Sequence, residues 1–250
     1  MDGDELTTPG SWDRLWSDRG RKAGVRSRLR TQTAWINLLG RLIDSSPAGA
    51  DVLELGCAPG AMIEQLHALR PDRQYRGIDI AEDGLKIARE RLSAQEISAD
   101  LSLGDIRDAV IPPTDLVMSF GLVEHFTSPS DALRNHRRFV KSGGHVAVTV
   151  PNYAHPVVVK AMRWFSPETL ATHNLAIMSV PALHRAMSDA GLTEIEVGES
   201  GGATLPNSRP RPGPLGTAYR TTARAWKLGT TLLPEGRPWS SSLWAVGRVP

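Results

Sequence analysis

The chain has 250 residues, and its 29 basic and 27 acidic side chains leave a formal net charge of +2. Hydrophobic residues make up 40% and charged residues 22%, ordinary globular usage that excludes a disordered or collagen-like chain. The single cysteine, Cys57, excludes an intrachain disulfide, and no apolar run approaches the roughly 18 residues of a membrane span. Because no secretory signal is visible at the polar N-terminus, we expect a cytoplasmic protein.

Apolar residues at helical spacing predict helices within residues 11–43. Two groups show this spacing, namely Trp12, Leu15 and Trp16, and Trp35, Leu38, Leu39 and Leu42. Between them, residues 14–30 carry a run of basic side chains. We interpret the run as a solvated helix face; the alternative is an arm or lid that meets an anionic group of a ligand.

From residue 51 onward, short apolar stretches alternate with amphipathic ones. Strands are predicted at residues 51–56, 74–80, 99–103, 115–120, 145–150, 194–197 and 243–249. Helices are predicted at residues 61–69, 82–95 and 131–140. This alternation is typical of a right-handed parallel α/β sheet. A further helix is delimited by an N-cap at Ser179, an early Pro181 and the C-terminal Gly191.

Two segments interrupt this pattern. Residues 152–178 carry aromatic and histidine side chains without clear turn signals. Residues 198–218 are rich in Gly, Pro and Arg, which predicts a loop or a mobile linker, and a helix at about residues 217–233 follows it.

The loop after the first strand is the most informative stretch. Residues 52–60 have the sequence VLELGCAPG, in which a buried strand ends at Gly56 and a helix begins at Gly60. Small residues let a ligand approach the backbone, and a helix start offers N–H groups and a positive dipole end to an anion. Asp79, at the end of the next strand, can accept hydrogen bonds from the ribose hydroxyls of an adenosine. Enzymes that use nicotinamide and enzymes that use S-adenosylmethionine share these features. Ala58 and Ala61, where a dinucleotide fingerprint has glycine, favour the second group.

Five motifs in order identify a resemblance. The chain resembles the class I S-adenosylmethionine-dependent methyltransferases, in the small-molecule group (type 11/12) that includes ubiquinone-pathway enzymes. The matching motifs are Glu54, Gly56, Ala58 and Gly60; Asp79; Gly104, Asp105 and Ile106; residues 115–126; and residues 139–152. The chain departs from the family pattern at two positions: Ala58 stands where the first motif has Gly, and Ser142 stands where the last motif usually has Pro.

The resemblance implies an α/β fold with a Rossmann-like, mostly parallel seven-stranded sheet, helices on both faces and an N-terminal helical lid. It implies one domain over residues 1–250. In that domain the lid covers 1–50, the core sheet covers 51–199 and 240–250, and substrate-side insertions lie at 152–178 and 200–239. The implied cofactor is S-adenosylmethionine, and the residues implied to bind it are Glu54, Gly56, Cys57, Gly60, Asp79, Ile80, Asp105, Ile106 and Phe120. Asp105 would meet the adenine amino group, and Cys57 would contribute its backbone rather than its sulfur.

Methyl transfer to a hydroxyl group benefits from a general base, and ligands of open α/β sheets bind beyond the carboxyl ends of the strands. His125 follows the fourth strand and is the candidate base; alternatively, Glu124 and His125 only fix their loop. His155 and His173 are second-rank candidates. The side chains that could roof an acceptor pocket are Trp12, Trp16, Tyr153, Trp164 and Phe165. No spacing of His, Asp or Glu suggests a metal site.

The leading hypothesis is therefore a methyltransferase that acts on a small molecule, at oxygen rather than nitrogen, and the Arg-rich composition suggests bacterial secondary metabolism. An RNA or protein acceptor is an alternative, because residues 14–30 and 209–211 could track phosphates. The small net charge argues against a nucleic-acid partner. Two further alternatives are a nicotinamide-dependent oxidoreductase and a cofactor-binding protein without activity. The sequence leaves the oligomeric state open.

Overall fold

A seven-stranded sheet organises the chain. The computed structural model describes residues 6–19, 30–46, 49–201, 212–230 and 240–250. The strand order is β3-β2-β1-β4-β5-β7-β6. The first five strands pair in parallel, and they are β1 (Asp51–Leu55), β2 (Gln74–Asp79), β3 (Ala99–Leu103), β4 (Thr114–Phe120) and β5 (Val140–Pro151). β7 (Ser242–Arg248) lies antiparallel between β5 and β6 (Thr193–Ser200). The predicted mostly parallel seven-stranded sheet is confirmed.

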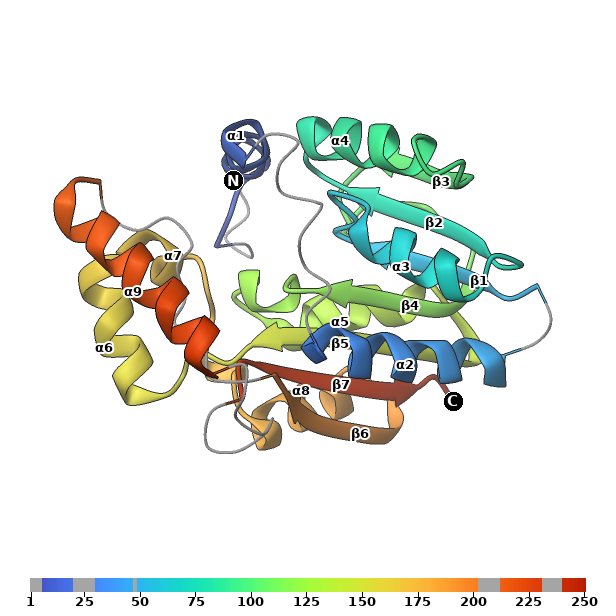
Figure 1. Cartoon of the computed structure of the whole chain (residues 1–250). Coiled ribbons are helices and arrows are strands. Elements are labelled where there is room, and N and C mark those ends of the chain that lie inside the picture. Colours follow the sequence, from blue (N-terminus) through green and yellow to red (C-terminus); the bar gives the residue numbers. More distant parts are fainter. Residues whose placement is uncertain (1–5, 20–29, 47–48, 202–211, 231–239) are drawn as a thin grey trace.

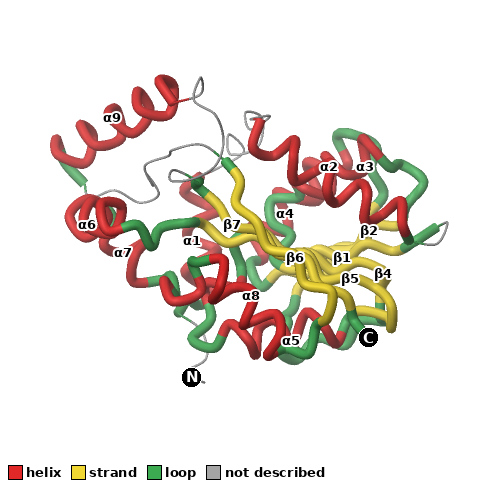
Figure 2. Tube along the Cα trace, turned by 90° about the horizontal axis from the view of Figure 1, so that it is seen from below, coloured by secondary structure: helices red, strands yellow, loops and turns green. Residues whose placement is uncertain are grey.

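Helices cover both faces of this sheet (Figure 2). One face carries α2 (Arg30–Ser45), α3 (Ala61–Leu69) and α4 (Glu82–Ser93). The other face carries α5 (Pro129–Arg138) and α8 (Val180–Asp189). Each face buries its own apolar cluster: Leu39, Ile43, Ile63 and Leu66 belong to the first, and Leu133, Leu183 and Met187 belong to the second. Burial on both faces explains why the central strands read as short apolar runs.

The remaining helices lie beyond the carboxyl ends of the parallel strands. Figure 1 shows the arrowheads of β4 and β5 pointing toward α1 (Pro9–Arg19), α6 (Pro156–Phe165), α7 (Pro167–Ala171) and α9 (Pro214–Thr230). α1 packs on α4, and the Ser17 hydroxyl donates to Asp83 Oδ2 over 2.6 Å. α6 contacts α9 through Phe165 and Tyr219, whose ring centroids stack 4.5 Å apart. No helix among the described residues is both long and apolar enough to cross a membrane.

Most predicted elements begin and end within a few residues of the observed ones, and β5 is an exception. It begins at Val140 rather than at residue 145 because Val140 pairs with Thr114 before a register shift. Gly144 allows this irregular stretch, since a Cβ there would lie 2.6 Å from the Asp115 carbonyl oxygen.

Two further expected bounds differ from the observed ones. β6 extends through Ser200, so the expected loop at residues 198–218 starts too early. α9 begins at Pro214 instead of residue 217. Much of the basic run at residues 14–30 and the arginines at 209–211 lie outside the described residues. The single domain, its lid at residues 1–50 and its insertions stay predictions.

Candidate functional site

The β1–α3 loop is shaped by two glycines and by one carboxylate. Gly56 and Gly60 have φ angles of 72° and 78°, a left-handed conformation that glycine adopts without strain. Asp79, at the end of β2, accepts hydrogen bonds from the Ala58 N–H over 2.9 Å and from the Ala81 N–H over 2.8 Å. Burial raises the pKa of Asp79, although these N–H groups act against the shift. Asp79 therefore holds the glycine loop against the end of β2.

A first cavity of about 260 Å³ opens beside this loop. Six of the nine expected cofactor residues line it: Gly56, Asp79, Ile80, Asp105, Ile106 and Phe120. α1 contributes further wall residues, Trp12, Leu15 and Trp16. The first cavity thus combines two carboxylates, a glycine turn and apolar side chains at the carboxyl ends of the strands.

The other three expected residues do not line the first cavity. Glu54 is buried in β1, and its Oε2 atom has no hydrogen-bond partner. Burial, reinforced by the nearby Asp79 charge, raises the pKa of Glu54 well above its ordinary value. The Cys57 side chain is buried against Gly77, as expected of a small packing residue. Gly60 faces α4, where an added Cβ would lie 3.2 Å from Ala88.

Asp105 lines the first cavity and is held by an ion pair with Arg107. The Arg107 Nε atom donates to both Asp105 carboxylate oxygens at 3.0 Å. Partial burial acts to raise the pKa of Asp105, but the bonds from Arg107 outweigh it and the pKa is lowered. Asp105 therefore stays ionised at neutral pH.

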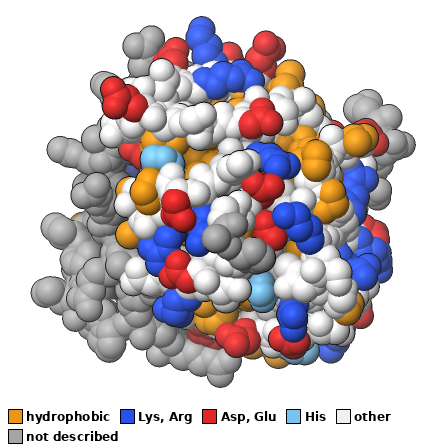
Figure 3. Space-filling view, turned by 90° about the vertical axis from the view of Figure 1, so that its right-hand side faces the viewer, with side chains coloured by type: hydrophobic (Ala, Val, Ile, Leu, Met, Phe, Trp, Pro, Cys, Tyr) orange, Lys and Arg blue, Asp and Glu red, His pale blue; other side chains and the backbone are white. Residues whose placement is uncertain are grey.

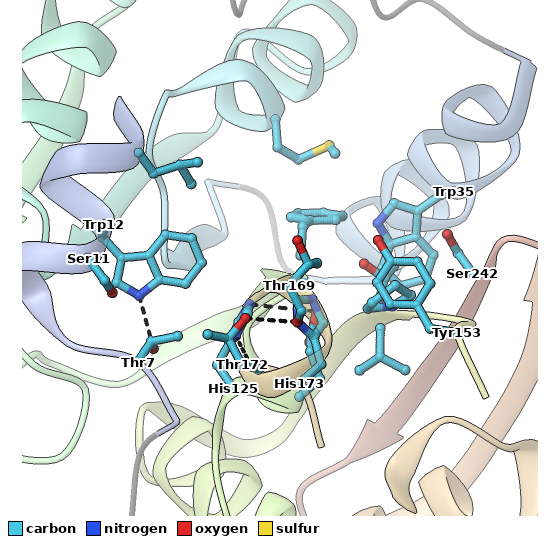
Figure 4. A pocket seen from close by; sticks show the side chains of 18 of the residues that line it. Thr7, Ser11, Trp12, Trp35, His125, Tyr153, Thr169, Thr172, His173 and Ser242 are labelled. Carbon is cyan, nitrogen blue, oxygen red and sulfur yellow. Dashed lines mark hydrogen bonds and ion pairs between the residues drawn. The ribbon is translucent and has the colours of Figure 1, made fainter. Parts of the chain in front are cut away.

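A second cavity of about 380 Å³ adjoins the first, and Trp12, Leu15, Phe120 and Gly121 line both. Aromatic residues form much of its wall, and Figure 4 shows Trp12 on one side, with Trp35 and Tyr153 on the other. Side-chain hydroxyls complete it, from Thr7, Ser11, Thr149, Thr169, Thr172, Ser200 and Ser242. Its volume suits a small molecule.

The expected aromatic roof is correct only in part. Trp12 and Tyr153 line the second cavity, whereas Trp16 lines the first. Trp164 and Phe165 line neither, so the prediction is wrong for these two. Trp164 is 63% exposed on α6, and Phe165 is engaged with Tyr219.

A polar cluster forms the floor of the second cavity. His125 lies in a 3₁₀ turn after β4, and its Nδ1 atom is 2.6 Å from the Thr172 carbonyl oxygen. The His173 ring is 4.5 Å from the His125 ring between centroids, and Figure 4 shows the two side by side. Glu124 Oε1 lies 4.0 Å from His125 Nε2. Burial raises the pKa of Glu124 to about 8, so this carboxyl group is mostly protonated at neutral pH.

Sequence reasoning missed how these three residues meet. His173 comes from the irregular segment after α7, and no local spacing links it to Glu124 and His125. The link is Asn174, whose N–H donates to the Glu124 carbonyl oxygen over 2.7 Å and whose side chain donates to Phe126 and Thr127. Within the described part of the chain, these three form a cluster in which one potential ligand atom from each residue lies within 4.8 Å of the others.

The other side chains after β5 have structural roles. Asn152 donates to the Ser240 carbonyl oxygen and hydroxyl, both over 3.1 Å. His155 is exposed and caps α6 by accepting from the Val157 N–H over 3.3 Å. His155 does not line the second cavity, which removes it as a candidate base.

Comparison with known proteins gives the class of protein. A family model described as a methyltransferase domain matches residues 27–197, which is more than half of the chain. The chain therefore belongs to this family of methyltransferase domains, as the sequence motifs indicated.

Curated relatives match the chain at low sequence identity. The ubiquinone biosynthesis O-methyltransferase of Thiobacillus denitrificans is 31% identical over 158 residues, which cover 60% of this chain and 67% of the relative. The enzyme of the same name from Alkalilimnicola ehrlichii is 28% identical, and the match covers only 42% of each protein.

Two solved structures show the same fold. The [4+2]-cyclase SpnF has a TM-score of 0.65 at 16% identity, with 100% of this chain and 99% of that chain covered. Phosphoethanolamine N-methyltransferase 2 of Haemonchus contortus, in complex with S-adenosyl-L-methionine, has a TM-score of 0.62 at 15% identity, with 86% and 52% covered. Because one of these neighbours is a cyclase, the fold by itself does not define the reaction.

Proposed function

We propose that this protein is an S-adenosylmethionine-dependent methyltransferase that methylates a small molecule at oxygen. The observation that carries the proposal is the pair of adjoining cavities with a shared wall at Trp12, Phe120 and Gly121. A cofactor in the first cavity and an acceptor in the second would meet at that wall. Family membership supports the reaction class, and the cofactor named for the Haemonchus contortus neighbour supports the choice of cofactor.

The residues of the first cavity fit this cofactor. Backbone N–H groups of Ala58, Ile80 and Ala81 bind the Asp79 carboxylate. A carboxylate offers about four lone pairs, so capacity remains for a ribose hydroxyl. The turn at Gly56 would hold the amino-acid part of the cofactor, and Asp105 would meet the adenine amino group.

When bound, the cofactor supplies an activated methyl group on a sulfonium. The protein's task is to hold the acceptor oxygen in line with that group and to exclude water, which strengthens interactions in the site. The aromatic and hydroxyl lining of the second cavity supports a role in binding an uncharged, hydroxylated acceptor.

His125 is the proposed proton acceptor. Because a carbonyl oxygen can only accept, the Nδ1 atom of His125 carries the hydrogen that bonds Thr172. The neutral ring then has its lone pair on Nε2, the atom nearest to Glu124. Nε2 would take the proton of the acceptor hydroxyl as the oxygen attacks the methyl carbon.

A macromolecular acceptor has less support. Figure 3 shows acidic and basic side chains intermixed on the face it presents, without a single-sign area of the kind that tracks phosphates. The net charge of +2 is also small.

Isothermal titration tests the proposal. S-adenosylhomocysteine should bind with one site per chain, and NAD⁺ and NADH should not. Binding of NADH in place of S-adenosylhomocysteine would support the oxidoreductase alternative and contradict the proposal. Turnover with matched hydroxyl and amine acceptors, followed by the S-adenosylhomocysteine formed, then distinguishes transfer to oxygen from transfer to nitrogen.

A further inference from the structure

Three ligand-type side chains converge at the floor of the second cavity. One potential ligand atom from each of Glu124, His125 and His173 lies within 4.8 Å of the other two. All three residues line the second cavity, and Figure 4 shows the two histidines facing it together. The cluster joins the turn after β4 to the segment after α7.

Both histidines are held in the same tautomer by the backbone. His125 Nδ1 lies 2.6 Å from the Thr172 carbonyl oxygen, and His173 Nδ1 lies 2.6 Å from the Thr169 carbonyl oxygen. Since a carbonyl oxygen only accepts, each Nδ1 atom is the donor, and the lone pair of each neutral ring is on Nε2. Histidine ligands of metals characteristically donate their other ring N–H to a backbone carbonyl or carboxylate, which fixes the ring for coordination.

Glu124 completes the donor set. Its side chain is 1% exposed, and its Oε2 atom has no hydrogen-bond partner. A buried carboxyl oxygen without a partner is costly, and a bound cation would satisfy it. Two ligand atoms of one tetrahedral ion, each at about 2.1 Å, lie about 3.4 Å apart, so metal binding must draw these three ligand atoms closer together than the 4.8 Å within which they now lie. The Glu124 Oε2 atom can approach an ion without breaking a hydrogen bond.

We propose that Glu124, His125 and His173 bind a divalent transition-metal ion at the floor of the second cavity. Two imidazoles and one carboxylate suit Zn²⁺, Co²⁺ or Fe²⁺ better than Mg²⁺, which prefers an all-oxygen shell. Three protein ligands leave at least one coordination position, as in catalytic sites. The second cavity, about 380 Å³ in volume, adjoins the cluster, so a bound small molecule could reach that position.

The proposed metal binding does not depend on the proposed methyl transfer. The role of the ion in activating the acceptor does rest on that proposed function. In the loaded site, an oxygen of the acceptor would coordinate the ion, which makes a hydroxyl more acidic. His125 is therefore the proposed proton acceptor of the metal-free protein, whereas in the metal-loaded protein it is a ligand and the ion makes the acceptor hydroxyl more acidic in its place. The two roles differ in a measurable way, because a metal site also requires Glu124 and His173.

The test is titration of the full chain with Co²⁺, followed by its visible absorption and by calorimetry, with Zn²⁺ as competitor. The variants are Glu124→Gln and His173→Gln, and the matched control is His184→Gln, which removes an exposed histidine far along the chain on α8. Every variant is also titrated with S-adenosylhomocysteine, since none of these residues lines the first cavity.

The expected result is one Co²⁺ per chain, displaced by Zn²⁺, with affinity reduced at least tenfold in both variants and unchanged in the control. Stoichiometric binding that both variants retain, or no binding by the unmodified chain, would overturn the proposal. If the variants do not fold, histidine NMR of the unmodified chain decides: Zn²⁺ must shift the signals of His125 and His173 and leave His184 in place. Co²⁺ binding without S-adenosylhomocysteine binding would contradict the proposed function alone, and the reverse would contradict the metal site alone.

Discussion

Single carboxylates and imidazoles line the two cavities, and the proposed chemistry depends on them. Asp79 both anchors the glycine loop and faces the first cavity. His125 and its neighbours face the second cavity. Because the first cavity contains neither Glu124 nor His125, cofactor binding and acceptor activation should respond to different substitutions.

Asp79→Asn should weaken S-adenosylhomocysteine binding by about 10- to 100-fold. The asparagine amide lacks the charge that favours ribose hydroxyls. Its NH₂ group is also a donor and would face the N–H of Ala58 or Ala81, so one hydrogen bond to a charged group is lost. Such a hydrogen bond contributes roughly 1.5–3 kcal/mol. Calorimetry measures the affinity, with Asp100→Asn on exposed β3 as the control. Equal affinities for the two variants would rule out the assigned role of Asp79.

His125→Ala should lower the turnover rate by about 10²- to 10⁴-fold and leave the affinity for S-adenosylhomocysteine unchanged, as expected when a proton acceptor is lost. The comparison uses S-adenosylhomocysteine formation with an accepted substrate and a separate binding titration. Near-wild-type turnover would remove His125 from the proposed reaction.

Packing between elements positions these side chains, and α1 is the clearest case. Trp16 is buried against Gly84 of α4, where an added Cβ would lie 2.7 Å from the Trp16 ring and 2.7 Å from the Ala58 Cβ. The segment before α1 is tied to the site as well, since the Leu6 N–H donates to the His125 carbonyl oxygen over 2.8 Å. α1 thereby contributes walls to both cavities.

Gly84→Ala should therefore weaken S-adenosylhomocysteine binding several-fold, because the new methyl group displaces α1 or the glycine loop. Gly40→Ala is the matched control: it also places alanine in a helix, but its Cβ would meet only Arg70 atoms at 3.7 Å or more. Calorimetry measures the affinity for S-adenosylhomocysteine, and tryptophan fluorescence reports the displacement of α1. If both alanine variants bind alike, α1 does not form part of the cofactor site.

His136 joins α5 to β4 and should make stability depend on pH. The ring is fully buried between Ser119 Oγ at 2.8 Å and the Ala132 carbonyl oxygen, and burial lowers its pKa to about 4. A histidine side chain in the unfolded protein has a pKa of about 6.5. Between that pH and about pH 4, the unfolded state therefore binds a proton that the folded state does not bind.

The free energy of unfolding should therefore fall by up to about 3 kcal/mol as the pH drops from about 6.5 to 4. Denaturant unfolding at several pH values measures this, and His136→Gln should flatten the pH dependence in that window, whatever its effect at pH 7.5. An unchanged slope in the variant would show that His136 does not titrate as described.

At the scale of the whole molecule, the regular part of the fold could be predicted because each strand and helix has a local signal. The apolar run into Gly56, for example, and Ser179 with Pro181 mark their elements within a few residues. The candidate site was predictable where it follows the strand ends, as with Asp79 and His125. It was not predictable where a long connection folds back, because Asn174 and His173 join the site through backbone carbonyls that no sequence pattern encodes.

The central claim is that the first cavity holds the cofactor with its reactive end toward the second cavity. A crystal structure with S-adenosylhomocysteine tests it most directly. We predict the adenine near Asp105, the ribose at Asp79, and the sulfur at the shared wall of Phe120 and Gly121, facing the second cavity. A ligand bound elsewhere, or with its sulfur turned away from that wall, would contradict the account.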